Sequence, residues 1–139
     1  QMCIRDRDIA NMIMDRVKTE DAIPYWDYDA PVTKETPRDV SAASVTASAM
    51  IELSTMVPDG QKYLDYAEKI LKSLSSDAYL AKVGDNQGFI LMHSVGSLPN
   101  GSEIDTPLNY ADYYYLEALK RFMELKKLKV ENGELRVIQ

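Results

Sequence analysis

Apolar residues recur at helical spacing in four segments of the chain, which polar or proline-rich stretches separate. These segments span about residues 8–19, 36–57, 61–74 and 107–128. Apolar side chains three and four positions apart lie on one face of an α-helix. Alternation of apolar and polar residues, which would indicate a strand, never continues beyond four positions. The pattern therefore predicts an all-α fold.

The second of these segments has the clearest helix signals. We expect Thr36 to be its N-cap, with Pro37 at the first helical position and Asp39 at the third. The sequence SAASVTASAM that follows has small side chains on every face, and a helix without a wide polar face is a buried, inner helix. Backbone N–H groups at its start, together with Arg38, form a natural anion site. The alternative is an ion pair of Arg38 with Asp39 or Asp29.

The third and fourth segments predict one outer and one inner helix. Gln61–Leu74 has one apolar and one charged face, and the short turn before it predicts a helical hairpin with the inner helix. The fourth helix is expected to begin at Pro107, with Asp105 or Thr106 as its N-cap. Its broad apolar face consists of Ala111, Tyr114, Tyr115, Ala118, Leu119, Phe122 and Leu125.

A loop between the first two helices carries the only tryptophan of the chain, within the sequence Tyr25-Trp26-Asp27-Tyr28-Asp29. Aromatic rings pack on the C–H faces of sugars, and carboxylates accept hydrogen bonds from sugar hydroxyls. Trp26 and Asp27 are therefore candidate sugar-binding residues, since functional residues often lie on loops. An equally weighted alternative is structural: Trp26 closes the end of the helical layer, and Asp27 caps a turn.

A second loop, before the last helix, brings together an imidazole and hydroxyl groups. His93, Ser94 and Ser97 are candidate ligand contacts, and Tyr110 and Asp112 are candidate supporting residues at the start of the helix. Asp112 is expected to hold the His93 loop by hydrogen bonds. A histidine after an apolar run is more often a packed residue bonded to a backbone carbonyl. In a barrel of helical hairpins both loops lie at one end.

Composition limits the possible partners. The 139 residues suffice for one domain, and the net charge of −6 argues against nucleic acid and anionic membrane surfaces. No apolar run approaches the roughly 20 residues of a membrane span. Cys3 is the single cysteine, and no Cys/His cluster has metal-binding spacing. The start, QMCIRDR, has no signal-peptide pattern. It resembles a sequencing-adapter read-through, so residues 1–7 are expected to be foreign to the natural protein.

Four stretches carry a resemblance to a known family. PYWDYDAP, PRDVSAASVTASAMIELS, YLDYAEKILKSLSS and GFILMHSVGSLPNGSEIDTPLNYADYYYLEALKR occur in this order. They resemble the C-terminal portion of glycoside hydrolase family 88, the unsaturated glucuronyl hydrolases. The resemblance implies an (α/α)6 barrel, of which residues 8–129 form the last two to three hairpins, followed by a tail at 130–139.

The resemblance also implies an activity. Members of this family release a 4,5-unsaturated uronic acid from lyase-generated oligosaccharides. An aspartic acid protonates the vinyl-ether double bond, water adds at C5, and no metal or organic cofactor is needed. The catalytic aspartates of the family, and the Arg/Trp pair that binds the uronate, have no counterpart in this chain. We therefore expect no catalytic residue here and an inactive fragment.

The same resemblance bears on the sugar next to the uronate. A Ser-x-x-Ser-x-Lys motif contacts a sulfate on that sugar in related enzymes, and here it is Ser94, Ser97 and Pro99. The missing lysine puts a preference for sulfate in doubt. Two alternatives stay open. One is an unsaturated rhamnogalacturonyl hydrolase of the same fold, and the other is a helical-repeat interaction scaffold, although the helices share no fixed period.

Overall fold

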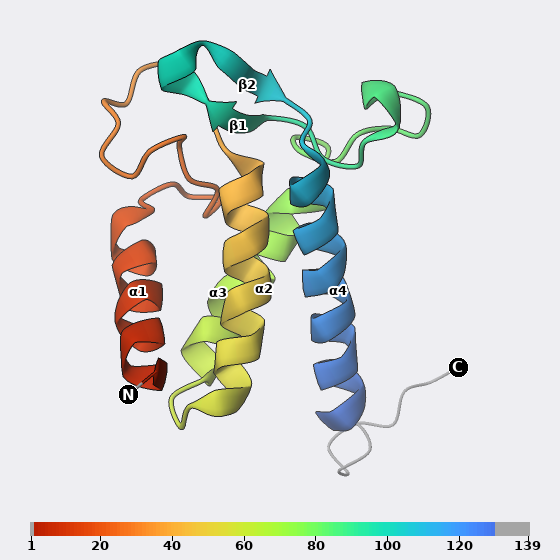
Figure 1. The fold of residues 1–139 in the computed structure, drawn as a ribbon. Helices are drawn as coiled ribbons and strands as arrows, with labels where there is room; N and C mark the ends of the chain where they lie inside the picture. Colours follow the sequence, from red (N-terminus) through yellow and green to blue (C-terminus); the bar gives the residue numbers. More distant parts are fainter. Residues whose placement is uncertain (1, 130–139) are drawn as a thin grey trace.

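The computed structural model describes residues 2–129, and its main elements are helices that share one core (Figure 1). The α-helices are α1 (Met2–Arg16), α2 (Val40–Met56), α3 (Gln61–Leu74) and α4 (Asn109–Lys129). Strands β1 (Ser94–Ser97) and β2 (Ser102–Thr106) form an antiparallel hairpin at the end of the molecule where α2 and α4 begin. Within residues 2–129 no helix is long and apolar enough to cross a membrane. The predicted all-α class is confirmed, with the hairpin as an addition.

Helix α2 is the centre of the fold. It lies between α1 and α4, and α3 packs against it from behind in the view of Figure 1. Ala43, Ala47 and Ser48 are almost fully buried, and such small side chains let the neighbouring helices approach closely. Ala111 and Ala118 of α4 are fully buried as well. The prediction of an inner helix is confirmed.

The connection from α2 to α3 depends on one glycine. Gly60 precedes α3 with an ordinary helical φ of −63°. A Cβ atom at this position would lie 2.0 Å from the carbonyl oxygen of Ser54, so only glycine fits. Helix α3 then buries the apolar face that the sequence predicts. The buried residues are Tyr63, Leu64, Ala67, Ile70, Leu71 and Leu74.

The predicted start of α2 is wrong by three residues. The N-cap is Asp39, not Thr36, and its side chain accepts a 3.0 Å hydrogen bond from the amide of Ser41. Thr36 instead bonds within its own loop, where its hydroxyl donates to the carbonyl of Pro31. Pro37 is not helical either, because its carbonyl accepts from the amide of Trp26 at 3.1 Å and the chain stays extended.

The predicted start of α4 is also wrong. Asp105 and Thr106 belong to β2, and the first helical residue is Asn109, so neither residue is the N-cap and Pro107 precedes the helix. The reason is that β1 pairs with β2 as far as Thr106. This hairpin was not predicted, because most of β2 is exposed and its sequence does not alternate.

The described part of the chain begins within a helix. Residues 2–7 are part of α1, and Arg7 forms a 3.3 Å ion pair with Asp59. That residues 1–7 are foreign to the natural protein stays a prediction. The predicted tail at 130–139 lies outside the described residues.

Candidate functional site

The loop before α2 and the β1–β2 hairpin lie at the same end of the helices (Figure 1). Between them is an open cavity of about 500 Å³, which we call the rim cavity. Arg38 and His93, both predicted site residues, line it together. Its other lining residues are Lys34, Glu35, Thr36, Pro37, Ala78, Tyr79, Leu98, Ile104 and Asp105. The structure thus brings residues from the two predicted loops to one hollow with both cations and acids.

His93 is held from several sides. Its Nδ1 lies 2.5 Å from the Oδ1 of Asp105, and the ring of Tyr79 meets the imidazole edge-on with centroids 6.2 Å apart. The His93 carbonyl accepts a 3.2 Å hydrogen bond from the amide of Val40, the first residue of α2. The imidazole therefore does not bond a backbone carbonyl, which was the structural alternative, but a carboxylate at the cavity wall.

Arg38 belongs to a polar cluster that meets the rim cavity through Arg38 and Tyr79. Its guanidinium hydrogen-bonds the carbonyl of Ile23, forms a 3.3 Å ion pair with Asp21, and lies over the ring of Tyr25. The alternative prediction, an ion pair of Arg38 with Asp39 or Asp29, is therefore wrong in its partner, which is Asp21. Asp21 also accepts a 2.6 Å hydrogen bond from the hydroxyl of Tyr79.

This cluster shifts two pKa values in opposite directions. Burial raises the pKa of Asp21, but hydrogen bonds from Tyr79 and the Ile23 amide and the charge of Arg38 outweigh it, so the net pKa is lowered. Burial, the hydrogen bond to Asp21 and the charge of that carboxylate raise the pKa of Tyr79. The phenol therefore stays protonated and donates to a carboxylate that is ionised at neutral pH.

Trp26 and Asp27 lie away from the rim cavity. Asp27 accepts a 2.7 Å hydrogen bond from the amide of Asp29. This bond forms the turn that is expected if Asp27 has a structural role. Asp27 lines a second cavity of about 500 Å³, and Arg38 lines both this cavity and the rim cavity. Trp26 is half-buried and lines neither cavity. Sugar binding by these two residues stays a prediction.

The two serines of the hairpin differ in exposure. Ser94 is fully buried, and its hydroxyl has no hydrogen-bond partner among the described residues. Ser97 is partly exposed, and its hydroxyl accepts a 2.8 Å hydrogen bond from the side-chain amide of Asn100. Neither serine lines the rim cavity. Their contact with a ligand stays a prediction, and for Ser94 it would require the hairpin to move.

Asp112 supports the segment that leads to His93. Its two carboxylate oxygens accept hydrogen bonds from the amides of Ile90, at 2.8 Å, and Leu91, at 2.9 Å. Tyr110, two residues before Asp112, is 41% exposed. Burial raises the pKa of its phenol, and a hydrogen bond with Ser41 opposes this. Asp112 thus fixes the chain two residues before the imidazole.

Several residues of this region were not among the predicted site residues. Asp21 and Tyr79 carry no motif, and nothing in the sequence indicates that residues 58 positions apart share a hydrogen bond. Asp105 was expected to be a helix cap, so its position beside His93 was missed. Within residues 2–129 no three His, Cys, Asp or Glu side chains gather as a metal site.

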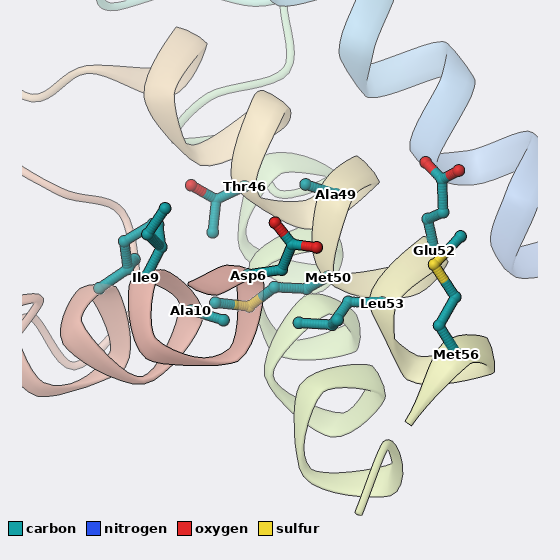
Figure 2. Close-up of a pocket in the computed structure, with 10 residues that line it drawn as sticks. Asp6, Ile9, Ala10, Thr46, Ala49, Met50, Glu52, Leu53 and Met56 are labelled. Carbon is teal, nitrogen blue, oxygen red and sulfur yellow. The ribbon is translucent and has the colours of Figure 1, made fainter. Parts of the chain in front are cut away.

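A different hollow lies far from these loops, between α1 and α2. This groove of about 400 Å³ is lined mainly by apolar side chains, among them Ile9, Ile13, Met50 and Leu53 (Figure 2). Asp6 and Glu52 are its charged members. It contains none of the predicted site residues and offers few polar groups to a sugar, so the rim cavity is the candidate site.

Curated relatives match most of this chain. An unsaturated glucuronyl hydrolase of Formosa agariphila is 48% identical over 106 residues, which cover 76% of this chain and 26% of that protein. An unsaturated chondroitin disaccharide hydrolase of Streptococcus agalactiae is 30% identical over 130 residues, which cover 88% of this chain and 31% of that protein. No family model matches the sequence.

Solved structures agree with these relatives. The crystal structure of an unsaturated glucuronyl hydrolase specific for heparin has a TM-score of 0.83 and 63% identity, over 86% of this chain and 32% of that chain. The enzyme of Bacillus sp. GL1 has a TM-score of 0.76 and 28% identity, over 83% of this chain and 31% of that chain. This chain is a homologue of the unsaturated glucuronyl hydrolases.

The homology confirms the predicted resemblance and the predicted fold class. The helices correspond to part of the (α/α)6 barrel of the unsaturated glucuronyl hydrolases. The chain spans about a quarter to a third of the length of the relatives it matches. In this group of homologues, a structure of an S. agalactiae unsaturated glucuronyl hydrolase mutant is complexed with dGlcA-GalNAc6S.

Proposed function

We propose that the full-length protein containing this chain is an unsaturated glucuronyl hydrolase that acts on oligosaccharides derived from heparin-like polysaccharides. The observation that carries this proposal is the 63% identity, over 86% of this chain, with an enzyme specific for heparin. The relatives named for chondroitin disaccharides are only 29–32% identical. The reaction would release a 4,5-unsaturated uronic acid by hydration of its vinyl-ether double bond, without a cofactor.

In this proposal the chain contributes a wall of the barrel and not the catalytic group. The rim cavity offers Arg38, His93 and Lys34 as hydrogen-bond donors. These groups suit the hydroxyl and acidic substituents of the sugar that follows the unsaturated uronate. The aspartates that protonate the double bond would come from the rest of the protein, so the 139-residue chain alone is expected to be inactive.

The test is an ultraviolet assay of the full-length protein on unsaturated disaccharides from heparin, chondroitin and rhamnogalacturonan. Hydration removes the double bond, so the absorbance should fall, and fastest for the heparin disaccharide. A fall on the rhamnogalacturonan product alone would favour the related hydrolase. No fall on any disaccharide would overturn the enzymatic proposal and favour the interaction scaffold.

A matched pair of variants tests the contribution of the loop before α2. Trp26→Ala should raise KM if the ring packs on a sugar, whereas Thr33→Ala, in the same loop and bonded only within it, should not. A Trp26→Ala protein with normal KM but a lower Tm would assign the ring to packing instead.

A further inference from the structure

A β-bulge places Asp105 beside His93. Ser94 pairs with Thr106 and Val95 pairs with Ile104, so Asp105 is an extra residue without a partner on β1. Its φ is +51°, in the left-handed region. A bulge re-aims the side chain of the extra residue, and bulges are frequent next to active sites. Here the bulge brings the Asp105 carboxylate within 2.5 Å of the imidazole.

His93 also has a left-handed backbone, with a φ of +68°. Such conformations are unfavourable for residues other than glycine and persist only where the surrounding contacts fix them. The contacts are present on both sides of the residue. The amide of Val40 bonds the His93 carbonyl at 3.2 Å, and the amide of Val95 bonds the Asp39 carboxylate at 3.3 Å. His93 is thus anchored to the first residues of α2.

The hydrogen bond between His93 and Asp105 determines which ring nitrogen faces a ligand. An ionised carboxylate only accepts hydrogen bonds, so Nδ1 of His93 must carry the proton in the bond with Asp105. No described residue hydrogen-bonds Nε2, and the ring lines the rim cavity. The ring of Tyr79 packs edge-on against the imidazole, with centroids 6.2 Å apart.

We propose that Asp105 is a positioning residue, which holds His93 with Nδ1 protonated and Nε2 directed into the rim cavity. There Nε2 bonds a hydroxyl or an acidic substituent of the sugar beyond the unsaturated uronate. Asp105 itself does not touch the sugar in this role. The inference rests on the proposed function. It explains with a single role the bulge, the left-handed backbone of His93 and Asp105, and the position of the carboxylate.

Kinetics of the full-length protein on the unsaturated heparin disaccharide test this role. Asp105→Ala should raise KM about three- to tenfold, the loss expected for one hydrogen bond, with kcat changed less than about twofold. Glu103→Ala is the matched control, because Glu103 is an exposed acid of the same strand with a φ of +52°. It is not bonded to His93, so KM should be unchanged.

A double-mutant cycle separates positioning from a general structural effect. Asp105→Ala should add nothing to KM in a His93→Ala background, because the carboxylate acts only through the imidazole. Equal effects of Asp105→Ala in both backgrounds, or a lower Tm with unchanged KM, would overturn the role.

A spectroscopic arm keeps the test independent of activity. In protein labelled with 15N-histidine, the His93 signals are those lost in His93→Ala, and Asp105→Ala should shift both of their nitrogens. Unchanged nitrogen shifts would overturn the positioning role. A wild-type protein that turns over no unsaturated disaccharide overturns the proposed function, and the labelled imidazole still decides whether Asp105 fixes His93.

Discussion

Asp112 should be one of the most stabilising polar residues of the described fold. Asp112→Ala removes two hydrogen bonds, of 2.8 and 2.9 Å, from the amides of Ile90 and Leu91 to one carboxylate. Hydrogen bonds to a charged group contribute about 1.5–3 kcal/mol each. Because the site is only partly buried, water can replace part of this, and we expect a loss of about 2–4 kcal/mol. For a chain of this length that lowers Tm by roughly 10 °C.

Thermal unfolding followed by circular dichroism measures this loss, and hydrogen exchange locates it. The amides of Ile90 and Leu91 should lose protection in Asp112→Ala, while those in the middle of α3 should not. Asp112→Asn retains one amide oxygen as acceptor and should lose about half as much. Glu124→Ala, an exposed acid on the same helix, should change stability by less than about 0.5 kcal/mol. If Asp112→Ala is as mild as this control, the two hydrogen bonds do not stabilise the fold.

Further substitutions test the interior and the polar cluster. Gly60→Ala should destabilise the protein by more than about 2 kcal/mol in urea unfolding, since the new Cβ would lie 2.0 Å from the Ser54 carbonyl oxygen; a neutral result would contradict this close approach. Ala118→Leu should cost about 1–3 kcal/mol by overpacking, because Ala118 is fully buried in the core, and urea unfolding measures this as well. Because the pKa of Asp21 is lowered, its ionised carboxylate stabilises the fold at pH values above the ordinary pKa of 3.8. This contribution is lost as the pH falls through the lowered pKa. Tyr79→Phe removes one cause of the lowering and should make stability fall less steeply in acid; an unchanged acid slope would contradict this.

The sequence predicts the helices well wherever their partners lie within the chain. The small residues of α2 and the two faces of α3 are sufficient, because α2 and α3 pack against each other. The first segment shows the opposite case. Ile9 and Met12 are apolar residues at helical spacing in this segment, yet they are 54% and 40% exposed. A helical pattern states that a face is apolar but does not identify what covers it.

The helix starts and the hairpin depend on contacts that a local pattern does not contain. Thr36 and Pro37 are a good start signal, but the bond from the Trp26 amide to the Pro37 carbonyl keeps them extended. The same holds for the candidate site. Its two loops could be predicted from residue types, whereas the partnership of His93 with Asp105 depends on a bulge in a hairpin of mostly exposed residues.

We propose that this chain forms a working part of an unsaturated glucuronyl hydrolase barrel. The most direct measurement uses a chimera in which residues 8–129 replace the corresponding segment of the homologous heparin-specific enzyme. With 63% identity between the two, the chimera should fold and remove the double-bond absorbance of the unsaturated heparin disaccharide, with kcat/KM within about tenfold of the parent enzyme. A folded chimera that leaves this absorbance unchanged would contradict the claim.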